Sequence, residues 1–379
     1  MKKRISIFLL ICAILAAMLP TLVYAGQPAE PQQVNGVYQI ATPENLLWFQ
    51  RRVSAGQTTI NAVLTADIDL STVCSAEQGN WTPIPAYGGT FDGKGHKISK
   101  LYISEATVAK QGLFAELSAT GVVQNVGAEN STVSMTTTKK INNACAAILV
   151  GRNSGGIILN CYVANSSVTT YGTLNGQGAA ICGSDQGGRV LNCFSRNNTI
   201  TEKNNKGQIS GICGYSKGHI ENCYTVETTL NTTNTNAKSV CGSTVGTMSN
   251  CFYLATGTAD QKATAKTKEW FMSDEAITAL GNKYFAKASN GENDGYPVLT
   301  FASLSADKTK LKAELDKVPT SGYYTEDDRY NGVDTSKNGF WADMKAFVTN
   351  AQEVYKDQSA GQAEVDRETD KLKNGLQAV

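Results

Sequence analysis

Gly156-Ile-Ile-Leu-Asn160-Cys161 is one of five stretches of this sequence that can be superimposed letter for letter. The other four are Gly121-Val-Val-Gln-Asn125-Val126, Gly188-Arg-Val-Leu-Asn192-Cys193, Gly218-His-Ile-Glu-Asn222-Cys223 and Gly246-Thr-Met-Ser-Asn250-Cys251. They recur at roughly thirty-residue intervals, the period of a supersecondary unit that must stack on its neighbours to bury its apolar side. The sequence therefore predicts a mainly β solenoid, and its function should be sought on the outside of the stack.

The asparagine column has its own structural explanation. Each unit reads as strand, turn, strand, turn, so corresponding strands of successive units are expected to run parallel. Asparagine tolerates the left-handed backbone that a tight bend requires, and stacked side-chain amides can hydrogen-bond along the stack. We therefore expect these asparagines to form a ladder at one bend of the coil.

Most of the ten cysteines fall in two further columns. The first column holds Cys161, Cys193, Cys223 and Cys251, and the second holds Cys182, Cys213 and Cys241. Val126 and Val150 occupy the same columns in other units, which indicates small buried apolar side chains. Neighbouring strands lie about 4.8 Å apart, whereas the two Cβ atoms joined by a disulfide are about 3.8 Å apart. A disulfide between stacked cysteines would therefore be strained. We expect reduced, inward-facing thiols, with strained cross-coil disulfides as the alternative.

The ends of the chain differ from the repeats. Residues 1–25 combine Met1-Lys-Lys-Arg, an apolar run and Val23-Tyr24-Ala25, which predicts a signal peptide and an exported protein. No later stretch is apolar enough to span a membrane. The net charge of +1 gives no reason to expect nucleic acid or an anionic membrane as a partner.

Residues 26–302 are predicted to form the solenoid and its caps. Thr42-Pro43-Glu44 opens a helix that should plug the first coil. Ser273 to Leu280 and Asn293 to Leu299 are expected to close the other end. Residues 303–379 are rich in charge and carry helical apolar stripes, which predicts a small three-helix bundle.

The solenoid region resembles a known family. Its residues are Tyr38-Gln-Ile, Leu64-Thr-Ala-Asp-Ile-Asp69-Leu, Gly89-Thr-Phe-Asp-Gly-Lys-Gly-His-Lys-Ile98, Gly112-Leu-Phe, the Ile-Cys-Gly and Asn-Cys repeats, and Tyr296-Pro-Val-Leu. Together they resemble the GLUG-motif surface proteins of Gram-positive and gut bacteria, over roughly residues 36–301. The resemblance implies a right-handed parallel β-helix on exported adhesin-like or host-interacting proteins. Ala115 departs from the motif, because Gly151, Gly183, Gly214 and Gly242 keep a glycine at the comparable place.

The tail is similar to FIVAR modules. Tyr323-Tyr-Thr, Phe340-Trp341 and Gln362-Ala-Glu-Val-Asp366 carry the similarity, whereas the insert at 327–338 is longer and more polar than the modules would have. The similarity implies a binding or spacer role on a bacterial surface.

Catalytic and metal-binding patterns are scarce. Asp67, Asp69 and Asp92 are the carboxylates to consider for a glycosidase or a calcium site, although strand ends and turns explain them as well. The sequence has only two histidines, His96 and His219, and neither stands at ligand spacing for zinc. It also has no His-Glu-x-x-His or phosphate-loop motif. We expect no catalytic activity, no metal and no cofactor.

The candidate ligand-binding residues are four aromatic side chains that follow column cysteines. Simple alternation would turn them outward as a stacked row able to dock a sugar ring or a protein: Tyr162, Phe194, Tyr224 and Phe252. The alternative is that these rings only stack on each other, or that the bend buries them.

The sequence as a whole predicts a secreted or cell-surface protein for binding or adhesion, with an extracellular glycan or a host or matrix protein as its partner. A carbohydrate-active β-helix enzyme, lyase or hydrolase, and a non-catalytic structural spacer are the alternatives.

Overall fold

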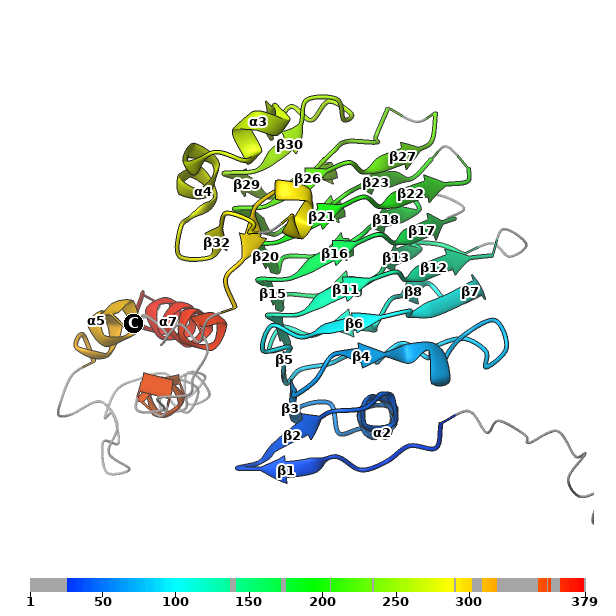
Figure 1. Ribbon diagram of the computed structural model, residues 1–379. Coiled ribbons are helices and arrows are strands. Elements are labelled where there is room, and N and C mark those ends of the chain that lie inside the picture. The colour runs from blue at the N-terminus through cyan, green and yellow to red at the C-terminus, as the bar shows by residue number, and fades with distance from the viewer. Residues whose placement is uncertain are drawn as a thin grey trace, which may run out of the picture.

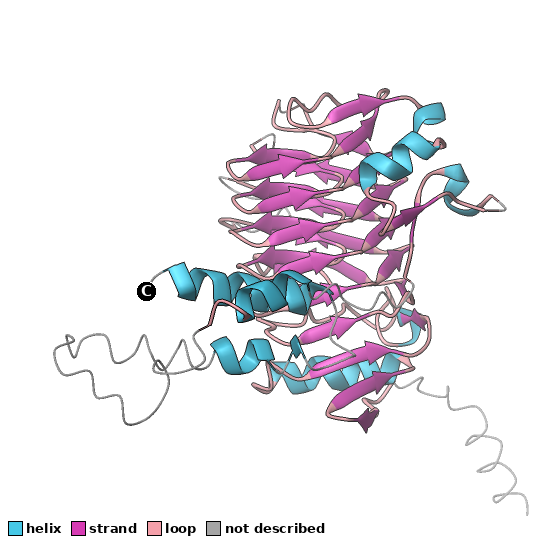
Figure 2. Ribbon diagram, turned by 90° about the vertical axis from the view of Figure 1, so that its left-hand side faces the viewer, coloured by secondary structure: helices cyan, strands magenta, loops and turns pink. Residues whose placement is uncertain are grey.

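The structure is a computed structural model that describes residues 26–136, 141–171, 175–204, 206–233, 235–289, 291–301, 309–318, 347–352, 354–355 and 362–377. Its main body is a β-solenoid whose coils stack along one axis (Figures 1 and 2). Each complete coil passes through five sheets, which we name sheets I to V in the order in which the chain visits them. The predicted signal peptide lies outside the described residues.

The strands divide among the sheets as follows. Sheet I holds β1 (Gln32–Val34), β2 (Val37–Ile40), β3 (Asn61–Leu64), β5 (Thr90–Asp92), β10 (Val122–Gln124), β15 (Ile157–Leu159), β20 (Arg189–Leu191), β25 (His219–Glu221) and β29 (Thr247–Ser249). Sheet II holds β4 (Ile68–Asp69), β6 (Lys97–Ser99), β11 (Gly127–Glu129), β16 (Tyr162–Ala164), β21 (Phe194–Arg196), β26 (Tyr224–Val226), β30 (Phe252–Leu254) and β31 (Thr264–Lys266). Sheet III holds β7 (Tyr102–Ala106), β12 (Thr132–Met135), β17 (Ser167–Thr170), β22 (Thr199–Glu202) and β27 (Thr229–Asn231). Sheet IV holds β8 (Lys110–Gln111), β13 (Cys145–Ala147), β18 (Gln177–Ala179) and β23 (Gln208–Ser210). Sheet V holds β9 (Phe114–Leu117), β14 (Val150–Asn153), β19 (Cys182–Asp185), β24 (Cys213–Ser216) and β28 (Cys241–Thr244).

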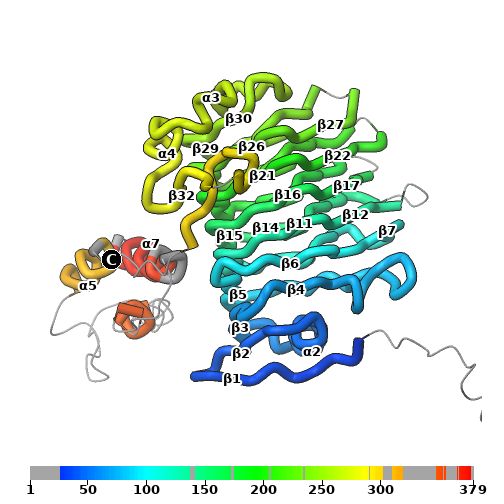
Figure 3. The backbone as a smooth tube through the Cα atoms, viewed as in Figure 1, coloured from blue at the N-terminus to red at the C-terminus, as the bar shows by residue number. Residues whose placement is uncertain are grey.

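Successive coils pair in parallel and in register, as predicted. Along sheet I, Val123 pairs with Ile158, Ile158 with Val190 and Val190 with Ile220. The predicted pattern of two strands per unit is wrong, because each coil breaks into five short strands separated by sharp bends. The backbone trace in Figure 3 shows these bends stacked above one another. The right-handed sense of the coil stays a prediction.

The predicted asparagine ladder lies at the bend from sheet I to sheet II. Asn125, Asn160, Asn192, Asn222 and Asn250 all have a left-handed backbone, with φ between 50° and 53°. Asn160 donates from Nδ2 to Oδ1 of Asn125 at 3.1 Å, and Asn222 donates likewise to Asn192 at 3.0 Å. Asn250 donates to Asn222 at 3.2 Å. The ladder is interrupted above Asn160, whose buried Oδ1 accepts no hydrogen bond.

A second left-handed column lies at the bend from sheet II to sheet III. Asn130, Asn165 and Asn197 have φ between 50° and 52°, and Glu227 occupies the next coil with φ 52°. Asn197 donates from Nδ2 to Oδ1 of Asn165 at 2.8 Å. The sequence analysis missed this column because its flanking residues vary from unit to unit. Each coil therefore closes through two recurring left-handed bends.

The column cysteines are free and buried, as predicted. Cys161, Cys193, Cys223 and Cys251 each donate their thiol to the carbonyl two residues earlier, at 3.2 Å in every case. The column therefore supplies a weak donor to the carbonyl that precedes each bend asparagine, besides filling space in the core. Cys145 differs, because it packs outside the solenoid core.

The N-terminal helix covers the first coil, as predicted. Helix α2 (Pro43–Ser54) begins after Thr42, whose hydroxyl accepts from the backbone N–H of Asn45. Its buried face includes Phe49, whose ring centroid lies 5.7 Å from Tyr87 and 5.8 Å from Phe91. Nearby, the short 3₁₀ turn η1 (Leu70–Thr72) is capped by Asp69.

The C-terminal cap is placed differently from the prediction. Residues 267–301, here called the cover segment, hold α3 (Lys268–Phe271), α4 (Asp274–Leu280), β32 (Phe285–Ala286), η2 (Glu292–Gly295) and β33 (Val298–Leu299). Instead of closing the last coil, the segment folds back along the outer face of sheet II (Figure 1). The end of the stack is contacted by Asp260, whose Oδ2 accepts from the backbone N–H groups of Val240 and Cys241 at 3.1 and 3.0 Å.

The tail contributes helices α5 (Thr309–Leu315) and α7 (Gln362–Gln377) to the described residues. Leu311, Val348, Val365 and Leu372 belong to one buried apolar cluster that joins these helices to residues 347–352 and 354–355. Helix α7 lies against β10, beside a buried apolar patch of Val122, Ile157, Leu159 and Leu191 on the outer face of sheet I. The predicted three-helix bundle falls largely outside the described residues and stays a prediction.

The ladder can be tested at Asn222, which bonds both neighbouring asparagines. Asn222→Gly keeps the left-handed backbone accessible and removes only the amide, whereas Asn222→Ala also strains the backbone by about 1–2 kcal/mol. We expect denaturant unfolding to rank the wild type above the glycine variant and the glycine variant above the alanine variant. An alanine variant as stable as the glycine variant would contradict the role given to φ.

The cysteine chemistry predicts a simple labelling pattern. Without reductant, the native mature chain, which lacks Cys12, should react very slowly with maleimide at neutral pH, because its nine cysteines are buried. After denaturation all nine should react. Mass spectrometry counts the added groups, and a pair of cysteines protected in the denatured chain would reveal a disulfide.

Candidate functional site

A column of glycines lets sheets IV and V approach each other closely. Gly151, Gly183, Gly214 and Gly242 stand at the second position of the sheet V strands. A Cβ atom on Gly183 would lie 2.8 Å from the backbone nitrogen of Ala146 in sheet IV, and the other three meet the same obstacle at 2.7–2.8 Å. Each of these glycines faces the sheet IV strand of the coil before it. Ala115 in β9 faces no such strand, because β8 is the first strand of sheet IV, so a side chain fits there.

The two sheets form a re-entrant corner whose walls are polar. The sheet IV wall presents the first residue of each strand, namely Cys145, Gln177 and Gln208 in register. The sheet V wall presents Arg152, Ser184 and Tyr215, also in register. A groove of about 340 Å³ lies between them, which we call the corner groove, lined by Asn143, Cys145, Arg152, Asn175, Gln177, Ser184, Gln186, Gln208, Tyr215 and Lys217.

Hydrogen bonds run along the sheet IV wall. The Cys145 thiol lies 3.2 Å from the carbonyl oxygen of Asn143 and 3.4 Å from Oε1 of Gln177, and can donate to either. Nε2 of Gln177 donates to Oε1 of Gln208 at 3.4 Å. Burial raises the pKa of Cys145 to about 11, so its thiol stays protonated at neutral pH. Cys145 therefore acts as a hydrogen-bond donor here, and not as a nucleophile.

The charge of the corner groove comes from Arg152 and Lys217, and its lining includes no carboxylate. The nearest acidic partner is Glu116, which lies outside the lining and 3.7 Å from Nε of Arg152. Glu116 forms an ion pair with Lys110 and accepts from Ser154 at 2.6 Å. Burial alone would raise the pKa of Glu116, but these partners hold it below its usual value. Glu116 is thus ionised at neutral pH and is shared among Lys110, Ser154 and Arg152.

The predicted acidic candidates serve as caps of turns. Asp69 accepts from the backbone N–H of Ser71 at 2.9 Å and pairs with Lys100 at 2.8 Å. Asp92 accepts from the backbone N–H of Lys94 at 2.8 Å and from Asn125 at 3.0 Å, where it starts the asparagine ladder. The structural explanation of these two residues is confirmed.

Asp67 is exposed, and its Oδ1 accepts from the backbone N–H of Lys97 at 3.2 Å and lies 3.1 Å from Nδ1 of His96. Within the described residues, no three histidine, cysteine or acidic side chains are grouped so that they could hold a metal ion.

Asp185 is a buried carboxylate that the sequence analysis did not single out. Its Oδ1 accepts from Asn153 Nδ2 at 3.2 Å and from the Gly188 N–H at 2.8 Å. Its Oδ2 accepts from Ser216 Oγ at 2.8 Å and from the Gly218 N–H at 3.1 Å. Burial raises its pKa, and these donors oppose that rise. Because every donor belongs to the bend from sheet V to sheet I, Asp185 stabilises that bend.

The aromatic column forms a stack, but it is not an open binding row. Tyr162, Phe194 and Tyr224 have ring centroids 4.9 and 5.1 Å apart in nearly parallel planes. The rings face away from the solenoid core, as alternation predicts. Phe194, Tyr224 and Phe252 are nevertheless only 3%, 0% and 9% exposed. The rings thus stack on each other and are largely buried, as the alternative had it, because the cover segment lies over them. A ligand-binding role for these four residues stays a prediction.

Apolar contacts hold the cover segment on this stack. Phe271 and Phe285 lie 5.4 and 5.9 Å from the Tyr224 ring, and Trp270 lies 4.8 Å from Phe252. Tyr162, at the lower end, is half-buried, and its hydroxyl donates to Glu129 Oε1 at 2.8 Å. The stack ends at Gly127, where the Tyr162 ring occupies the space a side chain would need.

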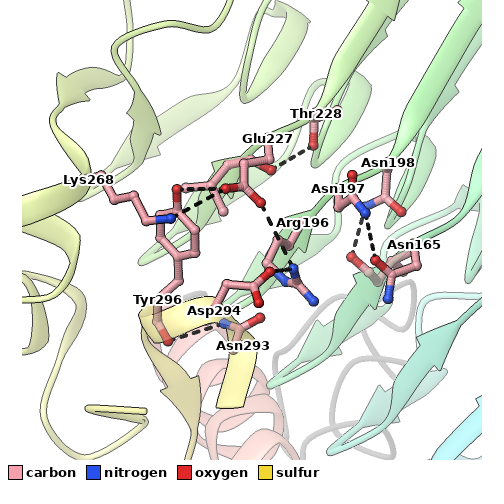
Figure 4. Close-up of polar contacts among 12 residues, drawn as sticks. Asn165, Arg196, Asn197, Asn198, Glu227, Thr228, Lys268, Asn293, Asp294 and Tyr296 are labelled. Atoms are coloured by element: carbon pink, nitrogen blue, oxygen red, sulfur yellow. Dashed lines mark hydrogen bonds and ion pairs between the residues drawn. The ribbon is translucent and has the colours of Figure 1, made fainter. Parts of the chain in front are cut away.

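A cluster of polar contacts also holds the cover segment on sheet II (Figure 4). Arg196 pairs with Asp294 of the cover segment and lies 3.9 Å from Glu227. Glu227 also accepts from the Tyr296 hydroxyl at 3.1 Å and lies 3.8 Å from Lys268. These ion pairs join sheet II to the cover segment, so the cluster serves to attach that segment. We therefore take the corner groove as the candidate site.

The sequence analysis missed the corner groove entirely. Its glycine column was visible as a repeat, but the residues of its walls differ in type from coil to coil. The only available signal was positional: one set of wall residues begins each sheet IV strand, and the other set directly follows each column glycine of sheet V. Recognising them requires knowing that the two strands face each other across a corner.

Comparisons with known proteins are sparse. No family model matches the chain, so the resemblance to GLUG-motif proteins and FIVAR modules stays a prediction. A stretch of 168 residues, 41% of this chain, is 29% identical to Halomucin of Haloquadratum walsbyi, and the match spans 2% of that protein. Among solved structures, a candidate immunoglobulin A1 protease from Bacteroides ovatus aligns with a TM-score of 0.44 and 17% identity, over 73% of this chain and 94% of the other.

No helix within the described ranges has both the length and the apolar character needed to cross a membrane.

The burial of the aromatic stack predicts the effects of two substitutions. Tyr224→Phe keeps the ring and loses the hydroxyl contacts to Pro297 and Asn293, which should cost about 1 kcal/mol. Tyr224→Ala removes a fully buried ring and should cost about 3–5 kcal/mol. Denaturant unfolding measures both, and hydrogen exchange of residues 267–301 should increase most in the alanine variant. Equal stability of the two variants would contradict the stack as a structural element.

Proposed function

We propose that this chain is an exported, non-catalytic binding protein that recognises an extracellular glycan through the corner groove. The lining of that groove is the observation that carries the proposal. Its amide side chains can each donate and accept, which suits the paired hydroxyl groups of a sugar. The ring of Tyr215 adds an apolar surface on which a sugar ring can pack.

The position of the groove supports the same proposal. Its wall residues stand on paired strands of two sheets, so their geometry is held by the backbone hydrogen bonds of neighbouring coils. A fixed set of polar side chains binds a rigid polar ligand with little loss of conformational entropy.

Export and surface location rest on the predicted leader at 1–25 and on the resemblance to GLUG-motif surface proteins. In this proposal the solenoid is a right-handed display rod, and residues 303–379 form a FIVAR-like helical module that binds or spaces.

Hydrolysis or lysis of the glycan is less well supported. A glycosidase needs two carboxylates about 5–9.5 Å apart beside the sugar. The lining of the corner groove contains no carboxylate, and Asp69 and Asp92 cap turns elsewhere. These observations favour binding without cleavage. A pure spacer would show no ligand at all.

The proposal predicts binding that depends on the groove. The mature chain, screened on arrays of extracellular glycans and of host matrix proteins, should retain glycans. Tyr215→Ala and Gln177→Ala should each weaken the best glycan about tenfold, or about 1.4 kcal/mol. Gln261→Ala, an exposed position outside the groove, is the matched control and should change nothing. Retention of matrix proteins alone, or of no ligand, would contradict the proposal.

Catalysis has a separate test. Incubation of the mature chain with the retained glycan should release no reducing ends. Release that disappears in Asp67→Ala or Asp92→Ala would instead establish a carbohydrate-active enzyme.

A further inference from the structure

We infer that the ligand of the corner groove is an acidic polysaccharide whose carboxylate or sulfate groups are held by Arg152 and Lys217. This inference rests on the proposed function and names the class of glycan within it.

The charges of the corner groove favour an anionic ligand. Arg152 and Lys217 are its two charged lining residues, and both are positive. The whole chain has a net charge of only +1, so this local excess does not reflect a generally basic protein. An excess of one sign inside a concave site selects ligands of the opposite sign.

The guanidinium of Arg152 is only partly paired within the protein. Its Nε is buried and donates no hydrogen bond, although Glu116 lies 3.7 Å away. Glu116 is already engaged by Lys110 and Ser154, so it does not saturate the guanidinium. The planar fork of arginine is suited to a carboxylate or a sulfate, which it can grip through two parallel hydrogen bonds.

The spacing of Arg152 and Lys217 favours a polymer over a single small anion. Arg152 lies on β14, and Lys217 directly follows β24, two coils further along the stack. At about 4.8 Å per strand, the two positions are about 10 Å apart along the solenoid axis. Tyr215 lies beside Lys217 at the upper end, and Ser184 lies between the two ends. A chain lying along the axis would thus meet cations at two places and a ring surface beside one of them. This arrangement fits a polymer with recurring negative charges better than a single small anion.

The opposite wall is consistent with a sugar polymer and not with a nucleic acid. Gln177 and Gln208 offer amides along the same direction. A single-stranded nucleic acid would need a series of aromatic platforms and a continuous basic track, whereas Tyr215 is the one aromatic residue in the lining.

The test compares matched ligands on the mature full-length chain. Polygalacturonate should bind, its fully methyl-esterified form should bind at least tenfold more weakly, and added salt should weaken the binding of the charged form. Affinity electrophoresis and calorimetry measure these differences. A short single-stranded RNA and free galacturonic acid complete the set, and both should bind poorly.

The variants assign the charge recognition to residues. Arg152→Gln should weaken polygalacturonate at least tenfold, and Arg152→Lys should lie between it and the wild type. Lys217→Gln should weaken binding severalfold, and because Lys217 is exposed this variant tests the site even if changes at Arg152 disturb folding. Arg51→Gln removes an exposed arginine of α2 at the far end of the stack and should leave binding unchanged.

The outcomes separate the two levels of the proposal. Equal binding of the charged and the esterified polymer, or full binding by both Arg152→Gln and Lys217→Gln, would overturn the acidic-glycan inference and leave glycan binding standing. Tight binding of RNA or of the free sugar acid would overturn it as well. Failure of every glycan, neutral or acidic, would overturn the proposed function itself.

Discussion

A left-handed residue at the same bend of every coil is the constraint on which this structure depends. Asn125, Asn160, Asn192, Asn222 and Asn250 each turn the chain from sheet I into sheet II with nearly the same φ. A residue with a larger penalty for this conformation would open the bend and shift the next strand. Because the bend recurs unchanged, each strand returns in register with the one below it. Every column of side chains therefore becomes a straight row along the solenoid.

Whether a row of side chains is buried or exposed depends on its chemistry. Inward rows of valine, isoleucine and cysteine fill the core. The outward row of Tyr162, Phe194, Tyr224 and Phe252 would expose a continuous apolar strip, and the cover segment buries most of it. The rows that line the corner groove are polar, so they can remain in contact with water. Both surfaces arise from the same stacking rule, but only the polar one is left accessible to a ligand.

The chain beyond the coils determines which faces of the solenoid remain free. The cover segment occupies the outer face of sheet II, and α7 lies beside the apolar patch of sheet I. The corner between sheets IV and V has no such covering among the described residues. The two sheets can approach each other closely there because sheet V has glycines at the contact. The residues after the last coil thus cover parts of sheets I and II and leave the corner between sheets IV and V open.

The sequence by itself determined the stacking of this protein, because a repeat in the chain becomes a repeat in space when every unit has the same bend. The asparagine ladder, the buried cysteine columns and the cap at Thr42 could all be predicted, since each depends on local backbone preference or on a column of like residues. Even the outward direction of Tyr224 followed from alternation. Its burial did not, because Phe271 and Phe285 are distant in sequence and nothing in the repeat indicates where they fold. The corner groove was equally hidden, since Arg152 and Gln177 become opposite walls only after two sheets meet at an angle. Tertiary structure alone decided which outward rows are covered and which are open, because that choice depends on contacts between segments that share no sequence pattern.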